Sequence, residues 1–260
     1  MKRTSPHLCV LDLFSGFGGF ALGLQNAGMK ISAFCEIDPF CRRVLASNWP
    51  GTIIYEDVQT LTKERLVKDG LRKIDVVCGG FPCTDISVAG KRLGIAGPRS
   101  GLWKEFYRCV GEIRPAYVIV ENVPGRPGGN IDAWLGTVLG DLASLGYDAE
   151  WHCIPACAVG APHRRDRVWI IAHALRIRLS NWISNGLAER DIAEGKEEQA
   201  FAGHRSTWWS TEPRVVPLVH GLPRKLAGWR KASVMGLGNS LVPQIPELIG
   251  DMIMDYQDKQ

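Results

Sequence analysis

A cysteine, a carboxylate and two arginines stand where they could carry out covalent chemistry together. Cys83 follows the segment GGFP (79–82), a sharp turn after an apolar run. Glu121 lies near the end of a second apolar run, and Arg165 and Arg167 lie at the start of a third. A lone cysteine is more often a structural hydrophobe, but open α/β enzymes gather their reactive groups at strand ends on one side of the sheet. A nearby arginine would also lower the pKa of the Cys83 thiol and favour the nucleophilic thiolate.

A second group of residues is typical of a nucleotide-binding pocket. Residues 14–19 (FSGFGG) form a Gly-rich turn before a helical pattern, where glycine lets the backbone approach a ligand closely. Glu36 ends the next apolar run, a position from which an acid binds ribose hydroxyls, and Asp57 follows the third, within reach of an adenine edge. The spacing Gly16-x-Gly18-x-x-Ala21 also fits the loose nicotinamide-dinucleotide pattern. These residues alone leave hydride transfer, methyl transfer and a plain glycine turn open.

The composition is that of a folded protein of one large domain, or of one domain with a small second one. Of 260 residues, 45% are hydrophobic and 22% are charged, which excludes disorder, collagen and coiled coil. No stretch approaches the ~20 apolar residues of a membrane-spanning helix, and residues 1–6 lack a signal-peptide pattern. We therefore expect a cytoplasmic protein. Cys153, Cys157 and His163 lack a fourth ligand at zinc-finger spacing, so no metal is expected.

Short apolar runs alternate with helical patterns along most of the chain. Strands are predicted at 8–13, 31–38, 52–55, 74–80, 116–122, 147–154 and 167–174. Helices are predicted at 19–28, 39–47, 62–70, 101–113, 132–146 and 237–256. Fully apolar strands alternating with helices predict an α/β fold with a doubly wound, mostly parallel sheet that is covered on both faces.

Residues 173–236 differ in character from the rest. They contain ten of the 31 basic residues, six of the 27 acidic residues and four of the nine tryptophans, with repeated Gly and Pro. We expect them to form a small, irregular lobe, while residues 1–172 and 237–260 form the main domain. The basic excess is consistent either with a polyanionic partner or with an ordinary solvated surface.

The motifs, taken in order, resemble those of the DNA cytosine-5 methyltransferases. They are LDLFSGFGGF (11–20), EID (36–38), DV (57–58), GGFPCTDIS (79–87), VIVENV (118–123), RRDRVWIIA (164–172) and GNSLVPQ (238–244). The resemblance implies a Rossmann-like fold that binds S-adenosyl-L-methionine and methylates C5 of a cytosine within a short sequence context of double-stranded DNA. It implies a compact bacterial or phage-type enzyme, a monomer, with a cognate restriction endonuclease as a candidate partner. The lobe at 173–236 corresponds to the family's target-recognition domain.

The same resemblance assigns roles to the four residues that could do chemistry. Cys83 would add to C6 of a flipped-out cytosine, which makes C5 nucleophilic. Glu121 would hold the N3/N4 edge and help to protonate N3. Arg165 would support the base from its O2 side, and Arg167 would orient Glu121 or the loop.

The resemblance also implies the binding residues. Phe14 would stack on adenine, Phe17 and Gly19 would shape the methionine end, and Glu36 would bind the ribose. The full set of expected cofactor contacts is Phe14, Gly16, Phe17, Gly18, Gly19, Glu36, Ile37, Asp57, Val58, Pro82, Leu102, Asn239 and Ser240. The expected DNA contacts are Ser87, Arg99, Arg205, Arg214, Arg224, Lys225, Arg230 and Lys231.

Two departures from the family pattern remain. Thr84 stands where Gln commonly follows the nucleophile, and His163 stands where Gln commonly opens the arginine block. Neither change removes a reactive group. The alternatives are a tRNA cytosine-5 methyltransferase of the same fold, a catalytically idle DNA-binding relative, and a nicotinamide dehydrogenase that would leave GFPC, ENV and the arginine block unexplained.

Overall fold

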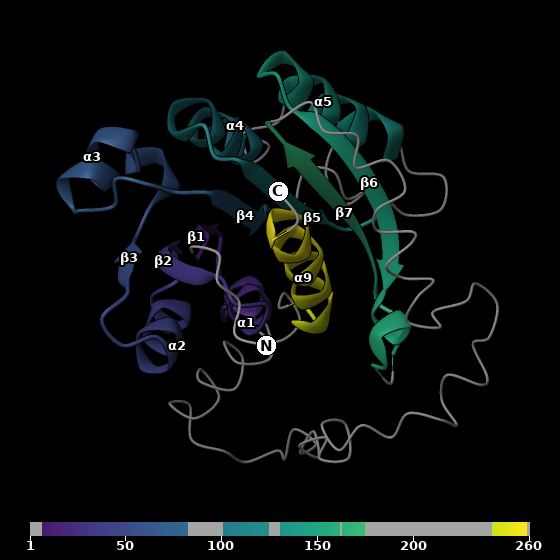
Figure 1. The fold of residues 1–260 in the computed structure, drawn as a ribbon, viewed down its shortest axis with the longest axis horizontal. Coiled ribbons are helices and arrows are strands. Elements are labelled where there is room, and N and C mark those ends of the chain that lie inside the picture. Colours follow the sequence, from purple (N-terminus) through teal and green to yellow (C-terminus); the bar gives the residue numbers. More distant parts are fainter. Residues whose placement is uncertain (1–6, 83–100, 125–130, 162, 175–240, 259–260) are drawn as a thin grey trace, which may run out of the picture.

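Seven strands form a single sheet in the computed structural model of the chain, which describes residues 7–82, 101–124, 131–161, 163–174 and 241–258 (Figure 1). The strands are β1 (Cys9–Leu13), β2 (Lys30–Cys35), β3 (Ile53–Tyr55), β4 (Val76–Gly80), β5 (Tyr117–Asn122), β6 (Asp148–Pro155) and β7 (Asp166–His173). The helices are α1 (Gly19–Asn26), α2 (Pro39–Asn48), α3 (Lys63–Lys68), α4 (Gly101–Ile113), α5 (Ile131–Ser144) and α9 (Gln244–Asp258). Short 3-10 turns lie at η1 (Val58–Thr60) and η3 (Ala156–Val159).

The strand order β3-β2-β1-β4-β5-β7-β6 confirms the predicted doubly wound sheet. The chain winds outward from β1 to β3 and then returns to β4 on the other side of β1, so the winding reverses between β1 and β4. All neighbouring strands are parallel except β7, which is antiparallel to both β5 and β6. Ligands of open α/β sheets bind at the carboxyl ends of the strands where the winding reverses.

The antiparallel direction of β7 determines where the arginine block lies. Glu121 of β5 is paired with Trp169 and Asn122 with Val168, so the start of β7 lies beside the end of β5. A parallel strand would have carried its first residues to the opposite edge of the sheet. Arg165 and Arg167 therefore share an edge with the ends of β1, β4 and β5 because of this reversal.

Side-chain caps fix several helix starts close to the sheet edge. Asp38 caps α2 by accepting a hydrogen bond from the Phe40 amide at 2.6 Å, and Pro39 begins the helix. Thr62 caps α3 by accepting from the Arg65 amide at 3.3 Å. The Asp38 cap starts α2 shortly after β2 ends at Cys35, whereas the Thr62 cap starts α3 after a longer connection that contains η1.

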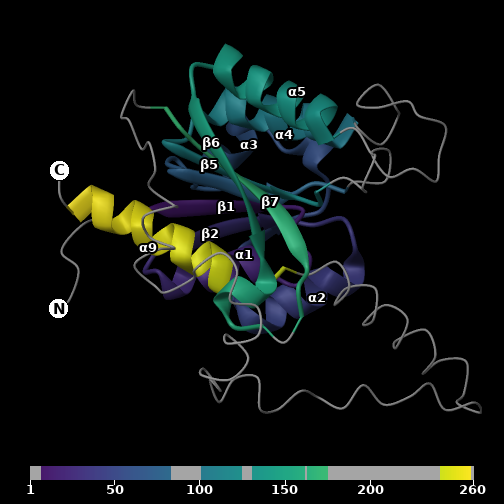
Figure 2. The same ribbon diagram turned by 90° about the vertical axis from the view of Figure 1, so that its right-hand side faces the viewer.

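Helices cover both faces of the sheet (Figure 2). A hydrophobic layer lies between the sheet and the helices on each face. Alternate strand residues face opposite ways: Leu11 and Val77 pack with α3, α4 and α5, whereas Val10 and Val76 pack with α1, α2 and α9. Helix α9 lies against α1, as the apolar face of the predicted C-terminal helix indicates. At this contact a Cβ on Gly23 would collide with the Pro243 carbonyl oxygen, so the two helices approach as closely as glycine allows.

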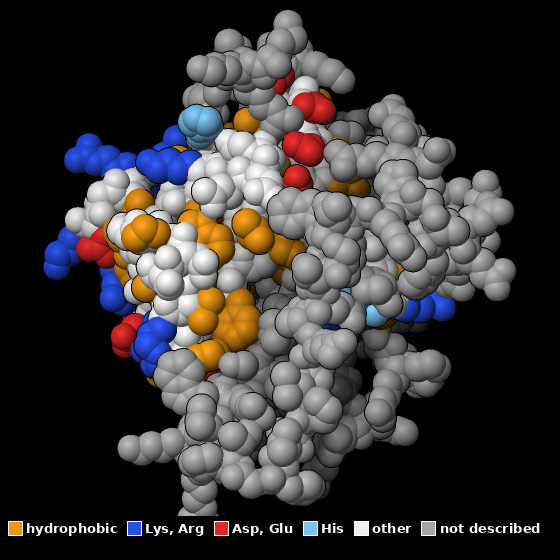
Figure 3. Space-filling view, turned by 90° about the horizontal axis from the view of Figure 1, so that it is seen from below, with side chains coloured by type: hydrophobic (Ala, Val, Ile, Leu, Met, Phe, Trp, Pro, Cys, Tyr) orange, Lys and Arg blue, Asp and Glu red, His pale blue; other side chains and the backbone are white. Residues whose placement is uncertain are grey.

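The described surface is mixed in character. Apolar side chains lie among Lys and Arg side chains on the face seen in Figure 3. The large apolar residues that are clearly exposed are Leu22, Ile37, Val67 and Trp151. Within the described ranges, no helix has both the length and the apolar character needed to cross a bilayer. The predicted lobe at 173–236 lies outside the described residues except for its first two positions.

Candidate active site

The Gly-rich turn after β1 takes a conformation that few side chains tolerate. Phe14 has a φ of 54°, Gly16 of 54° and Gly18 of 83°, and the left-handed region strains a non-glycine residue such as Phe14. A Cβ on Gly18 would lie 2.6 Å from the Trp49 ring, whereas one on Gly16 would meet no atom within 4 Å. The turn is therefore packed against the protein at Gly18 and open at Gly16.

The Phe14 ring is held from the side of α4. It stacks on Phe106 at a centroid distance of 6.4 Å and an interplanar angle of 17°, and it packs on the same core as Leu102. Phe17 instead packs edge-on against Phe40 of α2 at 5.8 Å, and Gly19 lies against Leu241. The turn thus presents one half-buried aromatic face at the end of β1, and a second aromatic ring beside α2.

Glu36 joins the first turn to the segment after β2. Its Oε2 accepts a hydrogen bond from the Gly16 amide at 2.7 Å, and its Oε1 accepts one from the Asp38 amide at 2.8 Å. The carboxylate is buried, yet the next residue, Ile37, is 72% exposed. An isolated exposed isoleucine is ordinary, but this one follows an acid that binds the Gly-rich turn after β1.

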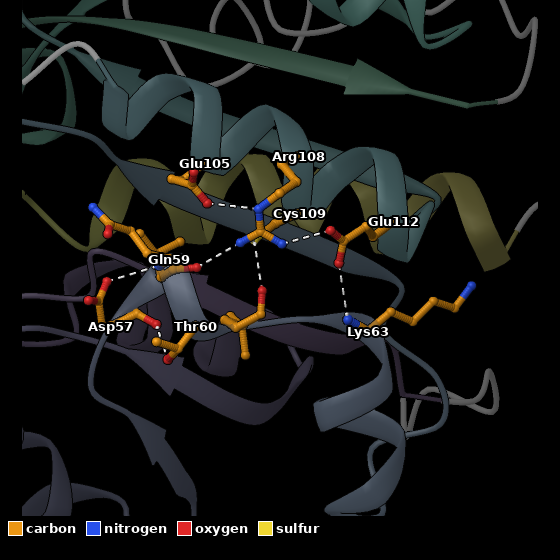
Figure 4. A network of polar contacts seen from close by, with 10 residues as sticks. Asp57, Gln59, Thr60, Lys63, Glu105, Arg108, Cys109 and Glu112 are labelled. Carbon is orange, nitrogen blue, oxygen red and sulfur yellow. Dashed lines mark hydrogen bonds and ion pairs between the residues drawn. The ribbon is translucent and has the colours of Figure 1, made fainter. Parts of the chain in front are cut away.

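Asp57 and Val58 form the third part of this edge. The Asp57 carboxylate caps η1 by accepting from the Gln59 amide at 2.9 Å, and its carbonyl accepts from the Thr60 hydroxyl at 3.0 Å. The Val58 carbonyl accepts from Nη2 of Arg108 on α4 at 2.8 Å (Figure 4). A set of ion pairs on α4 thereby fixes the backbone at the end of β3.

Glu121 and Arg167 form the most enclosed ion pair along the edge. Arg167 Nε lies 2.7 Å from Glu121 Oε1, and both side chains are largely buried. Burial raises the pKa of Glu121 above its usual value, although the Arg167 and Arg165 guanidiniums act in the opposite direction. Such a carboxyl can exchange a proton with a bound group at a higher pH than an exposed glutamate can.

Arg165 lies beside this pair in a strained conformation. Its φ is 39°, in the left-handed region. Burial, and next the charge of Arg167, lower the pKa of its guanidinium, and Glu121 opposes that shift. Arg164 points to the surface and pairs with Asp166 at 3.1 Å, so alternate residues of the block turn inward and outward.

The segment that leads to Cys83 is anchored on both sides. A Cβ on Gly80 would lie 2.6 Å from Oε2 of Glu121, so the end of β4 passes directly against the carboxylate. The Phe81 ring is buried against Trp103 and Trp134, and its carbonyl accepts from the Asn122 side chain at 3.4 Å. Pro82 is exposed and is the last described residue before Cys83.

Several of the expected site residues lie outside the described residues. These are the nucleophile candidate Cys83 with Thr84, Ser87 and Arg99, the cofactor candidates Asn239 and Ser240, and the lobe candidates Arg205, Arg214, Arg224, Lys225, Arg230 and Lys231. Among the described residues, no group of three or more metal-ligating side chains occurs.

Two residues stand out that the sequence argument did not single out. Arg108 binds the Val58 carbonyl, and its signal was the pair of acids at i−3 and i+4, Glu105 and Glu112. Asp12 is fully buried in β1. Among the described residues its Oδ2 has no hydrogen-bond partner, and its Oδ1 lies 3.7 Å from the Cys78 thiol. Its signal was a single acid within the apolar run LCVLDL.

A doubly wound α/β sheet with an acid after β2, an acid after β3 and a buried carboxylate–guanidinium pair at the carboxyl end of β5 is typical of a Rossmann-like, nucleotide-binding type of enzyme domain. The family model described as C-5 cytosine-specific DNA methylase matches residues 8–210, and the chain belongs to that family.

Curated relatives and a solved structure agree with this assignment. The chain is 36% identical over 167 residues to the Type II methyltransferase M2.BsuMI of Bacillus subtilis, covering 63% of this chain and 41% of that protein. It is 34% identical over 178 residues to the Type II methyltransferase M.AquIA of a Picosynechococcus strain, covering 64% and 72%. The crystal structure of a prophage protein from Escherichia coli, described as a DNA modification methyltransferase, has 30% identity and a TM-score of 0.57, covering 68% of this chain and 50% of that one.

Proposed function

We propose that this chain is a DNA cytosine-5 methyltransferase that transfers a methyl group from S-adenosyl-L-methionine to a flipped-out cytosine. The match spans about two fifths of M2.BsuMI and half of the prophage protein, so activity, substrate and partners are inferred from this chain's own residues. The observation that carries the proposal is the buried Glu121–Arg167 pair, which lies against Gly80, three residues before Cys83.

The residues along the edge fit the cofactor in chemical type. Phe14 offers an aromatic face for adenine. Glu36 offers carboxylate lone pairs for the ribose hydroxyls, since among the described residues each of its two oxygens accepts one backbone amide and has a second lone pair. Gly16 leaves open space where a side chain would stand, and Ile37 supplies exposed apolar surface. Asp57 and Val58 would bind the adenine edge. When bound, S-adenosyl-L-methionine supplies the methyl group that C5 of cytosine accepts.

The chain's own residues would perform the remaining chemistry. The Cys83 thiolate adds to C6 of cytosine, and the ring becomes nucleophilic at C5. Glu121, with its raised pKa, donates a proton to N3 as negative charge develops on the ring. Arg167 holds the Glu121 carboxyl in place, and Arg165 supports the base from its O2 side. After methylation a base removes the C5 proton, and elimination expels Cys83 and restores the aromatic ring.

The biological setting follows from the relatives' names and from the sequence. Proteins called Type II methyltransferases support a modification role, so we include a cognate restriction endonuclease as the partner that would act on the same DNA site. We propose that the basic residues of 173–236 bind double-stranded DNA, mostly through phosphate and in part through base edges. We further propose a cytoplasmic monomer, because one flipped base occupies one site.

Bisulfite sequencing of plasmid DNA from cells that express the chain tests the proposal. Protected cytosines are expected in one short sequence context, and a Cys83→Ser variant is expected to leave none. The matched control is Cys153→Ser, which alters an exposed thiol on β6 and is expected to keep the wild-type pattern. Protection that survives in Cys83→Ser would overturn the nucleophile assignment.

A second assay separates the substrates. The purified chain is incubated with labelled S-adenosyl-L-methionine and either duplex DNA or tRNA, and duplex DNA containing 5-fluorocytosine is used to trap the covalent adduct. We expect methylated DNA and a trapped complex with the wild type but none with Cys83→Ser. Labelled tRNA with unlabelled DNA would favour the RNA-directed relative, and no product with a folded protein would favour the idle DNA-binding one.

A further inference from the structure

Helix α4 contacts the proposed adenine site through several side chains, and Arg108 is the one that binds the Val58 carbonyl. Arg108 lies halfway along α4 and contacts the segment that follows β3 (Figure 4). This β3–α3 segment, residues 57–62, contains no regular structure beyond one 3-10 turn. Hydrogen bonds within the 3-10 turn hold part of its backbone, and the Val58 carbonyl in addition binds a partner from α4.

The three nitrogens of the Arg108 guanidinium are each engaged. Nε donates to Glu105 Oε2 at 2.7 Å, Nη1 donates to Glu112 Oε1 at 2.7 Å, and Nη2 donates to the Val58 carbonyl at 2.8 Å. The two carboxylates fix the plane of the guanidinium, so Nη2 can point in only one direction. A lysine has no planar fork and could not satisfy all three partners with one geometry.

Further contacts from α4 reach the same segment. The Cys109 thiol lies 3.9 Å from the Leu61 carbonyl, and Glu112 Oε2 accepts from the Lys63 amide at 3.2 Å. Helix α4 thus contacts Val58, Leu61 and the first residue of α3, Lys63. The Arg108 contact is the shortest of the three, and like the Glu112 contact it is charge-assisted.

The same helix also holds the opposite side of the proposed site. Phe106, two residues before Arg108, stacks on Phe14. Helix α4 therefore contacts both the Phe14 ring and the Val58 backbone. If adenine binds between them, α4 determines the distance between the two sides of its binding site.

We propose that Arg108 is a positioning residue of the cofactor site: it fixes the Val58 carbonyl, and with it the Asp57–Val58 edge, at the distance from Phe14 that an adenine ring requires. This inference rests on the proposed function, since it presumes that the edge binds S-adenosyl-L-methionine. It assigns to Arg108 an effect on cofactor affinity that is exerted through the Val58 backbone.

The test is the affinity for S-adenosylhomocysteine, measured by isothermal titration calorimetry on wild type, Arg108→Met and Arg108→Lys. We expect the Kd of Arg108→Met to rise about tenfold, equivalent to about 1.4 kcal/mol. Arg108→Lys retains a positive charge between Glu105 and Glu112, so it should destabilise the fold less than Arg108→Met does. It loses the guanidinium nitrogen that binds the Val58 carbonyl, so its Kd is expected to rise at least threefold. At saturating S-adenosyl-L-methionine, kcat is expected to stay within about threefold of wild type while KM for the cofactor rises.

Arg114→Met is the matched control. Arg114 follows α4 at its far end and donates from Nη1 to the Leu145 carbonyl at 2.6 Å, so the variant also removes an arginine–carbonyl hydrogen bond. Its Kd is expected to stay within twofold of wild type. Wild-type affinity in both Arg108 variants, or an equal loss in Arg114→Met, would overturn the inference and leave the proposed function intact. A wild type that binds no S-adenosylhomocysteine would overturn both.

Discussion

Replacing Gly80 by alanine tests whether the placement of the Glu121 carboxylate, and not merely its presence, governs the reaction. The added Cβ would lie 2.6 Å from Glu121 Oε2, whereas ordinary contacts begin near 3.4 Å, so the carboxylate must move by about 0.8 Å. The end of the side chain can yield, but only by distorting the 2.7 Å pair with Arg167. A misplacement of about 1 Å can cost roughly 100-fold in rate, and general acid–base groups contribute roughly 10²–10⁴-fold.

We therefore expect Gly80→Ala to lower kcat by about 100-fold while lowering stability by only about 1–2 kcal/mol, because the side chain that gives way is not part of the apolar core. Methyl transfer to duplex DNA is measured at saturating cofactor and DNA, and the unfolding midpoint in urea is measured in parallel. Gly140→Ala on α5 is the control, since a Cβ there meets no atom within 4 Å and kcat should not change.

A double-mutant cycle with Glu121→Gln separates this mechanism from a general disturbance of the loop. If Gly80→Ala acts through the carboxylate, it should add little to the loss already caused by Glu121→Gln, since groups that act as a unit are not additive. A fully additive loss would refute the reasoning. So would a folded Gly80→Ala enzyme whose kcat stays within threefold of wild type.

Two further predictions concern stability. Burial raises the pKa of Asp12, and hydrogen bonding to Cys78 is a smaller opposing effect. Above the unfolded-state pKa of about 3.9, the native state therefore holds more protons than the unfolded state. The free energy of unfolding of wild type should fall relative to that of Asp12→Asn as the pH rises. Urea unfolding at pH 5, 6.5 and 8 measures this, and a difference that does not change with pH would contradict it. Gly23→Ala should cost about 1–3 kcal/mol, because its Cβ would meet backbone atoms of Pro243 and, at 2.7 Å, the Glu247 amide nitrogen. A urea midpoint equal to that of wild type would contradict the close approach of α1 and α9.

The strands and helices could be predicted because their apolar patterns are strong. The helical pattern at 101–113 coincides with α4, and every predicted strand overlaps an observed one. The strand predicted at 31–38 was too long, however: β2 ends at Cys35 because the Glu36 carboxylate binds the Gly16 and Asp38 amides and turns the chain out of the sheet. The helix at 237–256 begins later, at Gln244, within the described residues.

The direction of β7 could not be derived from its pattern, because a continuous apolar run has the same appearance in a parallel or antiparallel strand. The connection did contain a signal. Only a short segment with one 3-10 turn separates β6 from β7, and parallel neighbours need a crossover of about a dozen residues or more, usually with a helix. The sequence predicts that Glu121 and the arginine block lie at one edge of the sheet. They do so because β7 is antiparallel to β5.

Contacts between side chains and distant backbone could not be predicted in the same way. The spacing of Glu105, Arg108 and Glu112 predicts ion pairs on one helix face, but nothing in that spacing identifies the Val58 carbonyl, fifty residues earlier, as the third partner. The collision of a Gly80 Cβ with Glu121 depends likewise on the register of β4 against β5. Such contacts arise from the tertiary arrangement and leave no local pattern.

The register of β1 against β4 explains why the two halves of the proposed site lie so close together. Leu13 of β1 is paired with Gly79 of β4, and a Cβ on Gly79 would collide with the Leu13 carbonyl oxygen. The turn that begins at Phe14 and the segment that leads to Cys83 therefore leave the sheet from adjacent strands, about 4.8 Å apart. In the proposed mechanism, a methyl donor bound by the first and the Cys83 thiol carried by the second would act on adjacent atoms of one cytosine ring. The spacing between them would then be set by the rigid sheet, and the loops would need only to orient the reacting groups.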